Sequence, residues 1–105
     1  MLLKSNRLLV GIGLSIVLLG CESYLPLTAA NARKIHVCID HKKAIREMFG
    51  PADEVGYIRG LTSWTYMERE ATSIKKMIVL FNRSGRVVDV AYNPPGLIEM
   101  KNTCD

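Results

Sequence analysis

Four potential metal ligands crowd into the stretch HVCIDH at residues 36 to 41. They are His36, Cys38, Asp40 and His41. Imidazole and thiolate groups are the ligands that Zn²⁺ prefers, but familiar zinc sites space them as Cys-x-x-Cys or His-x-x-x-His. Neither spacing occurs here, and oxidation competes for the thiol in an exported protein. We therefore predict no metal site.

A second thiol, Cys21, ends an apolar run. Residues 8 to 20 carry no charge and follow a short stretch that contains Lys4 and Arg7. A bilayer core takes about 20 helical residues, so this run is too short to span it and has the layout of a secretory signal peptide. Its end, Leu18-Leu19-Gly20-Cys21, resembles the bacterial lipobox, in which the Cys takes a diacylglycerol and becomes the first mature residue. An ordinary signal peptide is the alternative.

Acyl chains on Cys21 would attach the protein to a membrane. Each buried methylene contributes about 0.8 kcal/mol, so one chain detaches readily, whereas the two or three chains of a processed lipoprotein do not. Glu22 follows, and a residue other than Asp at that position favours the outer membrane in the enteric sorting scheme. We expect an outer-membrane lipoprotein, held in phospholipid by its anchor at the periplasmic face.

The two remaining cysteines, Cys38 and Cys104, form an even pair. In an exported protein such a pair predicts a disulfide. Closing a loop of this length would stabilise a small domain by about 4 kcal/mol.

The chain divides into a signal peptide at 1–20, a lipidated tether at 21–27 and one domain at 28–105. Within the domain, Thr28 can cap a short helix that runs to about Lys34. Asp40 is a candidate cap for a second helix, whose apolar stripe ends at Gly50-Pro51. Residues between Pro51 and Trp64 read as a surface loop.

The apolar period changes from 3.6 to 2 near Trp64. Three stretches alternate, TSWTYMERE, KKMIVLF and RVVDVAY, and the connections EATS and NRSG suit hairpins. Pro94-Pro95-Gly96 ends the pattern. The prediction is an α+β domain in which two N-terminal helices pack on a three-stranded antiparallel sheet, in the order ααβββ.

The composition and motifs point away from catalysis and from nucleic acid. The formal net charge is +4, but Lys4 and Arg7 leave with the signal peptide, so the mature chain is close to neutral. No nucleophile motif, phosphate loop or HExxH is found. Glu68 and Glu70 flank Arg69 and face Lys75 and Lys76 across a hairpin, which favours a solvated charged face over acid–base chemistry. We expect neither an enzyme nor a bound cofactor.

Trp64 and Tyr66 leave two interpretations open. A small sheet needs bulky side chains on its inner face, which favours packing against the helices. The alternative is a contact patch for lipid head groups or a protein partner. Arg59 and Arg69 could receive a phosphate there.

Several stretches together resemble the BamE (SmpA/OmlA) family of small outer-membrane lipoproteins. They are LTAANARKIHV at 27–37, AIREMFGPAD at 44–53, SWTYMER at 63–69 and MIVLFNRSGRVVDVAYNPPG at 77–96. This sequence departs from the family where Cys38-Ile39-Asp40 replaces its usual Gly-Met-Thr, and in a slightly longer loop before Trp64.

The resemblance implies a non-enzymatic accessory subunit of the machinery that assembles β-barrel proteins in the outer membrane. Such subunits contact a partner lipoprotein of that machinery and anionic phospholipid. Carried over by position, the contact residues would be Leu27, Thr28, Tyr57, Trp64 and Arg69, and we add Arg59. A second hypothesis is an envelope-stress or inhibitor-like lipoprotein that binds a soluble periplasmic protein through the same sheet and loop.

Overall fold

The computed structural model describes residues 23–93, 97–101 and 104, so the predicted signal peptide and Cys21 lie outside the described residues. Two helices precede five strands. Their bounds are α1 Ala29–Ala32, α2 Lys42–Phe49, β1 Glu54–Ile58, β2 Leu61–Arg69, β3 Ile74–Phe81, β4 Val87–Tyr92 and β5 Leu97–Met100.

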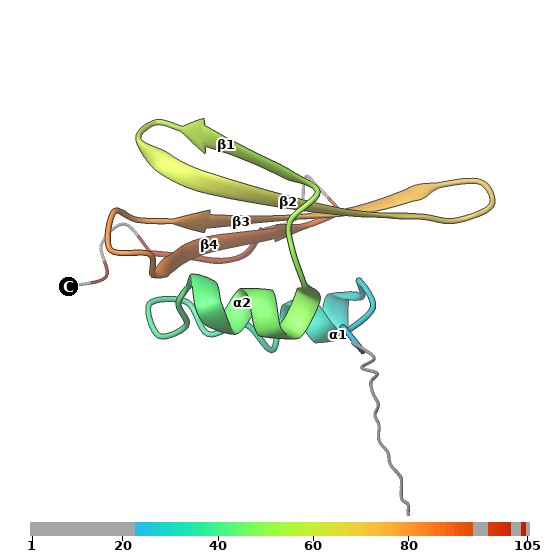
Figure 1. The fold of residues 1–105 in the computed structure, drawn as a ribbon, viewed down its shortest axis with the longest axis horizontal. Helices are drawn as coiled ribbons and strands as arrows, with labels where there is room; N and C mark the ends of the chain where they lie inside the picture. Colours follow the sequence, from blue (N-terminus) through green and yellow to red (C-terminus); the bar gives the residue numbers. More distant parts are fainter. Residues whose placement is uncertain (1–22, 94–96, 102–103, 105) are drawn as a thin grey trace, which may run out of the picture.

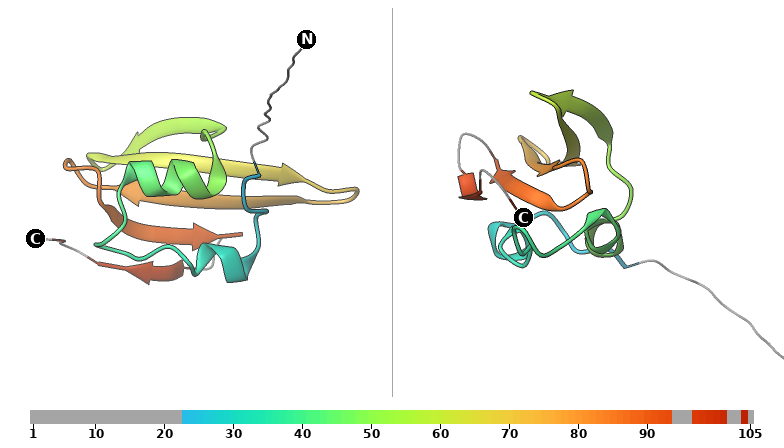
Figure 2. Two further views of the ribbon diagram at one scale, coloured as in Figure 1. Left: turned by 60° about the horizontal axis from the view of Figure 1, so that its bottom comes forward. Right: turned by 90° about the vertical axis from the view of Figure 1, so that its left-hand side faces the viewer.

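The strands form one antiparallel sheet in the order β1-β2-β3-β4-β5, so each strand pairs with its neighbour in the chain. Both helices lie against one face of this sheet (Figure 1), and two further views show the same layers (Figure 2). The predicted α+β class with an antiparallel sheet is confirmed. The predicted count of three strands is wrong, because β1 and β5 extend the sheet at its two edges.

β1 lies in the segment that was expected to be a surface loop. It pairs with β2 from Glu54 opposite Thr65 to Ile58 opposite Leu61. The turn between them is Arg59-Gly60, with φ angles of 52° and 84°. Two positive φ angles in a two-residue turn match the right-handed twist of a hairpin. The turn therefore folds a short, mostly exposed segment back onto β2.

β5 lies beyond the prolines that were expected to end the sheet. Pairing resumes at Leu97 opposite Ala91 and runs to Met100 opposite Asp89. A proline removes a ladder donor only at its own position, so prolines at 94 and 95 do not prevent pairing from Leu97 onward.

α1 is shorter than the predicted helix. Thr28 is its N-cap, as expected, and the Thr28 Oγ1 accepts a hydrogen bond from Asn31 N at 3.0 Å. After Ala32 the bonds change to a spacing of three residues, with Lys34 N donating to Asn31 O at 3.1 Å. This tighter turn ends the α-helix before Lys34.

α2 forms where its apolar stripe predicts, with Ile45 and Phe49 buried. Its N-cap is His41 rather than the expected Asp40. The Asp40 Oδ2 instead accepts from His36 N at 2.8 Å, which braces the preceding turn. The helix stops at Gly50, where φ is 84° and an added Cβ would lie 2.7 Å from ring carbons of Tyr24, so only glycine fits.

The core lies between the helices and the sheet face that they cover. Trp64 and Phe81 meet edge to face with ring centroids 4.8 Å apart, and Phe49 packs on Tyr66 at 5.8 Å. The other buried members of this core are Leu27, Ala32, Ile35, Val37, Ile45, Met77, Val79, Val87 and Val90.

The segment between the helices is bonded to the start of β4. Cys38 N donates to Val87 O at 2.7 Å and Val87 N donates to Asp40 O at 2.9 Å. Lys42 N donates to Gly85 O at 3.0 Å. Cys38 is also joined to Cys104 by the expected disulfide, across a sequence separation of 66 residues. Backbone and covalent bonds thus fix both helices and the C-terminal segment to one end of β4.

Reduction of this disulfide should lower the free energy of unfolding by about 4 kcal/mol, because it frees a long loop in the unfolded chain. Denaturant unfolding with and without dithiothreitol measures the difference. A Cys38→Ser, Cys104→Ser double variant is the control, since reductant should not change its stability further. Free thiols at both positions in unreduced protein from the periplasm would refute the bond.

Tyr66→Phe should destabilise the domain by about 1 kcal/mol and lower the Tm by about 5 °C. The Tyr66 hydroxyl donates to Gly50 O at 2.8 Å, and burial raises the pKa of Tyr66 to about 12. The variant leaves the buried carbonyl at the end of α2 without this donor. Tyr57→Phe is the matched control, because Tyr57 is 79% exposed and its loss of a hydroxyl should not shift the Tm.

Candidate functional site

Two of the six residues expected at the contact site are buried. Trp64 is 6% exposed and Leu27 is 5% exposed, and both belong to the core. The packing interpretation of Trp64 and Tyr66 therefore holds, and neither ring is free to form a contact patch. Leu27 and Trp64 can influence a partner only through the shape of the surface above them.

Two cations of α2 lie over the Trp64 ring. The Arg46 guanidinium carbon is 5.4 Å from its centroid and the Lys42 Nζ is 5.9 Å away. Lys42 also lies 5.7 Å from the Phe81 ring. Such cation–π contacts are worth about 0.5–1 kcal/mol at exposed sites, so these two side chains cover the edge of the core that the helix backbone leaves open.

Thr28 and the residues before it are docked on the domain. The Thr28 hydroxyl is engaged in its cap, and Leu25 N donates to Met48 O at 2.8 Å. Leu27 N donates to the Glu68 Oε2 at 3.3 Å. The expected tether at 21–27 is consequently much shorter in the structure, since residues 24–27 pack against α2 and β2.

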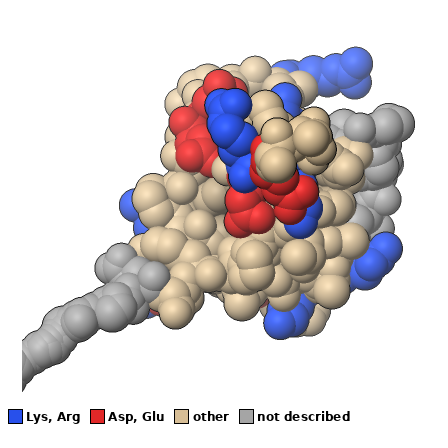
Figure 3. Space-filling model, turned by 90° about the vertical axis from the view of Figure 1, so that its right-hand side faces the viewer, with Lys and Arg blue, Asp and Glu red and all other residues tan. Residues whose placement is uncertain are grey.

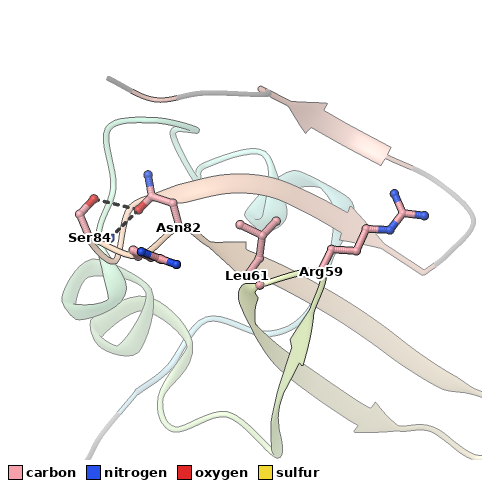
Figure 4. Close-up of a pocket in the computed structure, with 6 residues that line it drawn as sticks. Arg59, Leu61, Asn82 and Ser84 are labelled. Atoms are coloured by element: carbon pink, nitrogen blue, oxygen red, sulfur yellow. Dashed lines mark hydrogen bonds between the residues drawn. The ribbon is translucent and has the colours of Figure 1, made fainter.

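Tyr57 and Arg59 remain exposed on the β1–β2 hairpin. Beside the turn, a shallow hollow is lined by Arg59, Gly60, Leu61, Asn82, Arg83 and Ser84. Figure 4 shows the Arg59 side chain directed away from Asn82 and Ser84. The Asn82 Oδ1 already accepts from Ser84 N, from the Ser84 hydroxyl and from Arg86 N, at 2.8 to 3.1 Å. The Asn82 and Ser84 side chains that line the hollow are thus engaged in the β3–β4 turn.

Arg69 lies at the opposite end of β2 from Arg59. Leu61 and Arg69 are the first and last of the nine residues of β2, which places them about 26 Å apart. The two arginines therefore cannot share one phosphate, contrary to the expectation. Arg69 lies instead at the β2–β3 hairpin, on the side of the molecule where the N-terminal residues Tyr24 to Leu27 lie beside Met67 and Glu68.

Charges of both signs alternate at this hairpin. Glu68 pairs with Lys75 in the strand register, and the Lys75 Nζ forms an ion pair of 2.9 Å with the Glu70 Oε2. The hydrogen bond to Glu70 raises the pKa of Lys75. Acidic and basic atoms lie side by side on this end of the molecule (Figure 3). The expected charged face is present at this hairpin.

An exposed apolar group on β1 was not predicted from the sequence. Val55 is 61% exposed and Ile58 is 45% exposed, and with Tyr57 they leave this strand with little cover. No periodic signal marks them, because exposed residues occur on both faces of the strand. The one available signal was the Arg-Gly dipeptide between two short runs of apolar residues.

Two of the potential metal ligands in HVCIDH have other partners in the described part of the chain. The Cys38 sulfur is bonded to Cys104, and the Asp40 carboxylate lies 3.6 Å from the His36 Nδ1. No group of three His, Cys, Asp or Glu residues with metal-binding geometry occurs between residues 23 and 104 where the structure describes them. Over the same residues no helix is long and apolar enough to cross a membrane.

The chain matches no protein-family model, no curated protein and no solved structure.

Asp89 is the one buried carboxylate that the structure leaves without a hydrogen bond at an oxygen, among the described residues. It lies on the face of β4 opposite Leu80, it is 8% exposed, and its Oδ1 has no partner. Burial raises the pKa of the Asp89 carboxyl, and a backbone hydrogen bond at Val90 opposes that shift.

Asp89→Asn should therefore stabilise the domain at pH 7, by an amount on the order of 1 kcal/mol. The folded state of the wild type holds the Asp89 proton more tightly than the unfolded state. Its contribution to stability is present below the ordinary carboxyl pKa and is lost as the pH rises through the raised value. Thermal unfolding of both proteins from pH 3 to pH 8 should show the variant gaining on the wild type as the pH increases.

Glu47→Gln at an exposed position of α2 is the matched control. Its stability relative to the wild type should not rise with pH in the same way. A variant that is less stable than the wild type at every pH would mean that Asp89 makes a favourable contact in the native state.

Proposed function

We propose that this protein is a non-enzymatic outer-membrane lipoprotein. In this proposal it faces the periplasm and serves as an accessory scaffold or assembly factor of the machinery that assembles β-barrel proteins. The anchor is a lipid on Cys21 and the domain supplies contacts. The observation that carries the proposal is the lipobox-like Leu18-Leu19-Gly20-Cys21. Three residues after this Cys, Tyr24 already packs on Gly50 of the domain.

The short distance between Cys21 and the domain supports a role at the membrane surface. Tyr24 packs on Gly50 and Leu25 is hydrogen-bonded to α2. Tyr24 is the third residue after Cys21, and an extended chain spans at most about 3.6 Å per residue. A lipid on Cys21 would therefore hold the domain within about 11 Å of the head groups.

The side of the domain beside residues 24–27 suits a lipid surface. Arg69 is exposed at the β2–β3 hairpin, and Ile74 at its far end is 48% exposed. A cation can pair with a phosphate, and an apolar side chain can enter the interfacial region. In the proposed orientation this hairpin is the phospholipid contact, while Tyr57 and Arg59 at the other end of β2 are left for a protein partner of the assembly machinery.

The exposed β1 hairpin also favours the second candidate, an envelope-stress or inhibitor-like lipoprotein that binds a soluble periplasmic protein. Val55 and Tyr57 lie toward the turn end of β2, away from residues 24–27, where a soluble protein could reach them. A lipid-free Cys21→Ser form that still binds its target in solution would favour this candidate.

Metabolic labelling with palmitate, followed by affinity purification in mild detergent, tests the proposal. We expect label on the wild type and none on Cys21→Ser, and we expect barrel-assembly components to co-purify with the labelled protein. Arg69→Glu should reduce binding of the purified protein to anionic vesicles several-fold. Arg83→Glu at the opposite end of the domain is the charge-matched control and should leave vesicle binding unchanged. An unlabelled protein with an intact, free Cys21 thiol would contradict the anchor, and labelled protein that recovers only other partners would contradict the assembly role.

A further inference from the structure

β1 forms an edge of the sheet that the described chain leaves open. It pairs with β2 on one side, and no described strand lies on the other. Natural edge strands are commonly protected by lysine, proline or a covering loop. β1 contains neither Lys nor Pro, and its side chains are exposed, with Val55 at 61% and Tyr57 at 79%. A strand of this kind is a template for another strand.

The hydrogen-bond phase of β1 shows which groups face the open side. A two-residue turn closes on a hydrogen-bonded pair, here Ile58 and Leu61, and such pairs alternate along an antiparallel ladder. Glu54 therefore also bonds to β2, and Asp53 N continues this contact by donating to Thr65 O at 2.9 Å. It follows that Val55 and Tyr57 direct their N–H and C=O groups outward.

These outward groups are complementary to themselves. If a second β1 runs antiparallel with Gly56 opposite Gly56, then Val55 meets Tyr57 of the other copy, and Tyr57 meets Val55. Each such pair exchanges two backbone hydrogen bonds. An aromatic beside a β-branched side chain is a favourable cross-strand pair, and the central glycines add no side chain to either face of the joined strands.

The charges of the strand favour the same arrangement. Asp53 and Glu54 lie at its start, and Arg59 lies just after its end. None of the three forms an ion pair within the described chain. Antiparallel pairing places the acidic end of one copy beside the basic end of the other, with Asp53 opposite Arg59. A parallel pairing would put acid beside acid.

We propose that the occupant of this edge is a second copy of the chain, bound through β1 in an antiparallel, two-fold symmetric pair centred on Gly56. Five residues of strand bury far less than the 1,200 Å² or so of a stable interface, so the dimer is weak in dilute solution. This inference rests on the proposed lipid anchor, because attachment to one membrane surface raises the effective concentration of the copies.

Disulfide trapping in bacterial membranes tests the pairing in the full-length protein. In Gly56→Cys the two Cα atoms would lie about 4.5 Å apart, within the range that a disulfide bridges. Ile58→Cys is the matched control on the same strand, since its two copies would be four residues out of register, about 13 Å apart. Under a mild oxidant we expect at least fivefold more covalent dimer from Gly56→Cys.

Two further variants keep the test independent of the fit of a cysteine at position 56, where an added Cβ lies 3.2 Å from the Ser63 Oγ. Co-expressed Val55→Cys and Tyr57→Cys proteins should cross-link to each other, since these positions are opposite. Val55→Lys placed in the Gly56→Cys protein should abolish the dimer, because it sets a charge on the shared edge.

Each outcome of the trapping experiment either supports or overturns the proposed β1 dimer. Equal dimer yields from Gly56→Cys and Ile58→Cys would mean random collision and overturn the proposal. An adduct between Gly56→Cys and a different protein would show another occupant and overturn it too. Palmitate label with no trapped dimer rejects only this inference, whereas absence of the label rejects the anchor whatever the trapping shows.

Discussion

The bonded contact between residues 38–42 and the start of β4 determines how the rest of the domain is arranged. Three backbone hydrogen bonds and the Cys38 to Cys104 disulfide meet there. Together with the apolar core between the two layers, they hold α1 and α2 over one face of the sheet, and such bonds matter in a domain whose core is small. Trp64 is buried as a result, since α2 crosses above it and Lys42 and Arg46 close its edge.

Burial of the largest aromatic side chain limits what the surface can offer. The described residues present two regions of different character. The β2–β3 hairpin carries alternating acidic and basic side chains close to residues 24–27. The β1 edge carries Val55, Tyr57 and Ile58 and backbone groups that no described strand pairs. The first region suits phosphates and water, and the second suits another extended chain. In the proposed function, the first region contacts the membrane and the second contacts a protein.

The elements that could be predicted from the sequence are those with one buried face. α2 has an apolar stripe that ends at Gly50, and β3 alternates between buried and more exposed residues because one side of it packs on the helices. Trp64 and Tyr66 of β2 are buried on that same side. β4 differs, since Val87 to Val90 are all buried, and its apolar composition marks it as a strand. β1 gave no alternation, since Val55 and Ile58 are exposed on different faces. The burial of Trp64 and the docking of Leu25 depend on contacts with α2, which residue order alone does not reveal. Arg59 and Arg69 lie near opposite ends of β2, and the length of this strand separates them.

The hydrogen bond from Leu25 to Met48 also sets a limit on reach. Lipoproteins with long, unstructured leaders can sample a wide volume, whereas a chain that is fastened this soon after its acylated residue sweeps only a thin layer next to the lipid. In the proposed anchored form, any molecule that meets this domain has to travel to the bilayer itself. Inserting a few flexible residues between Cys21 and Tyr24 would let the anchored domain move farther from the bilayer.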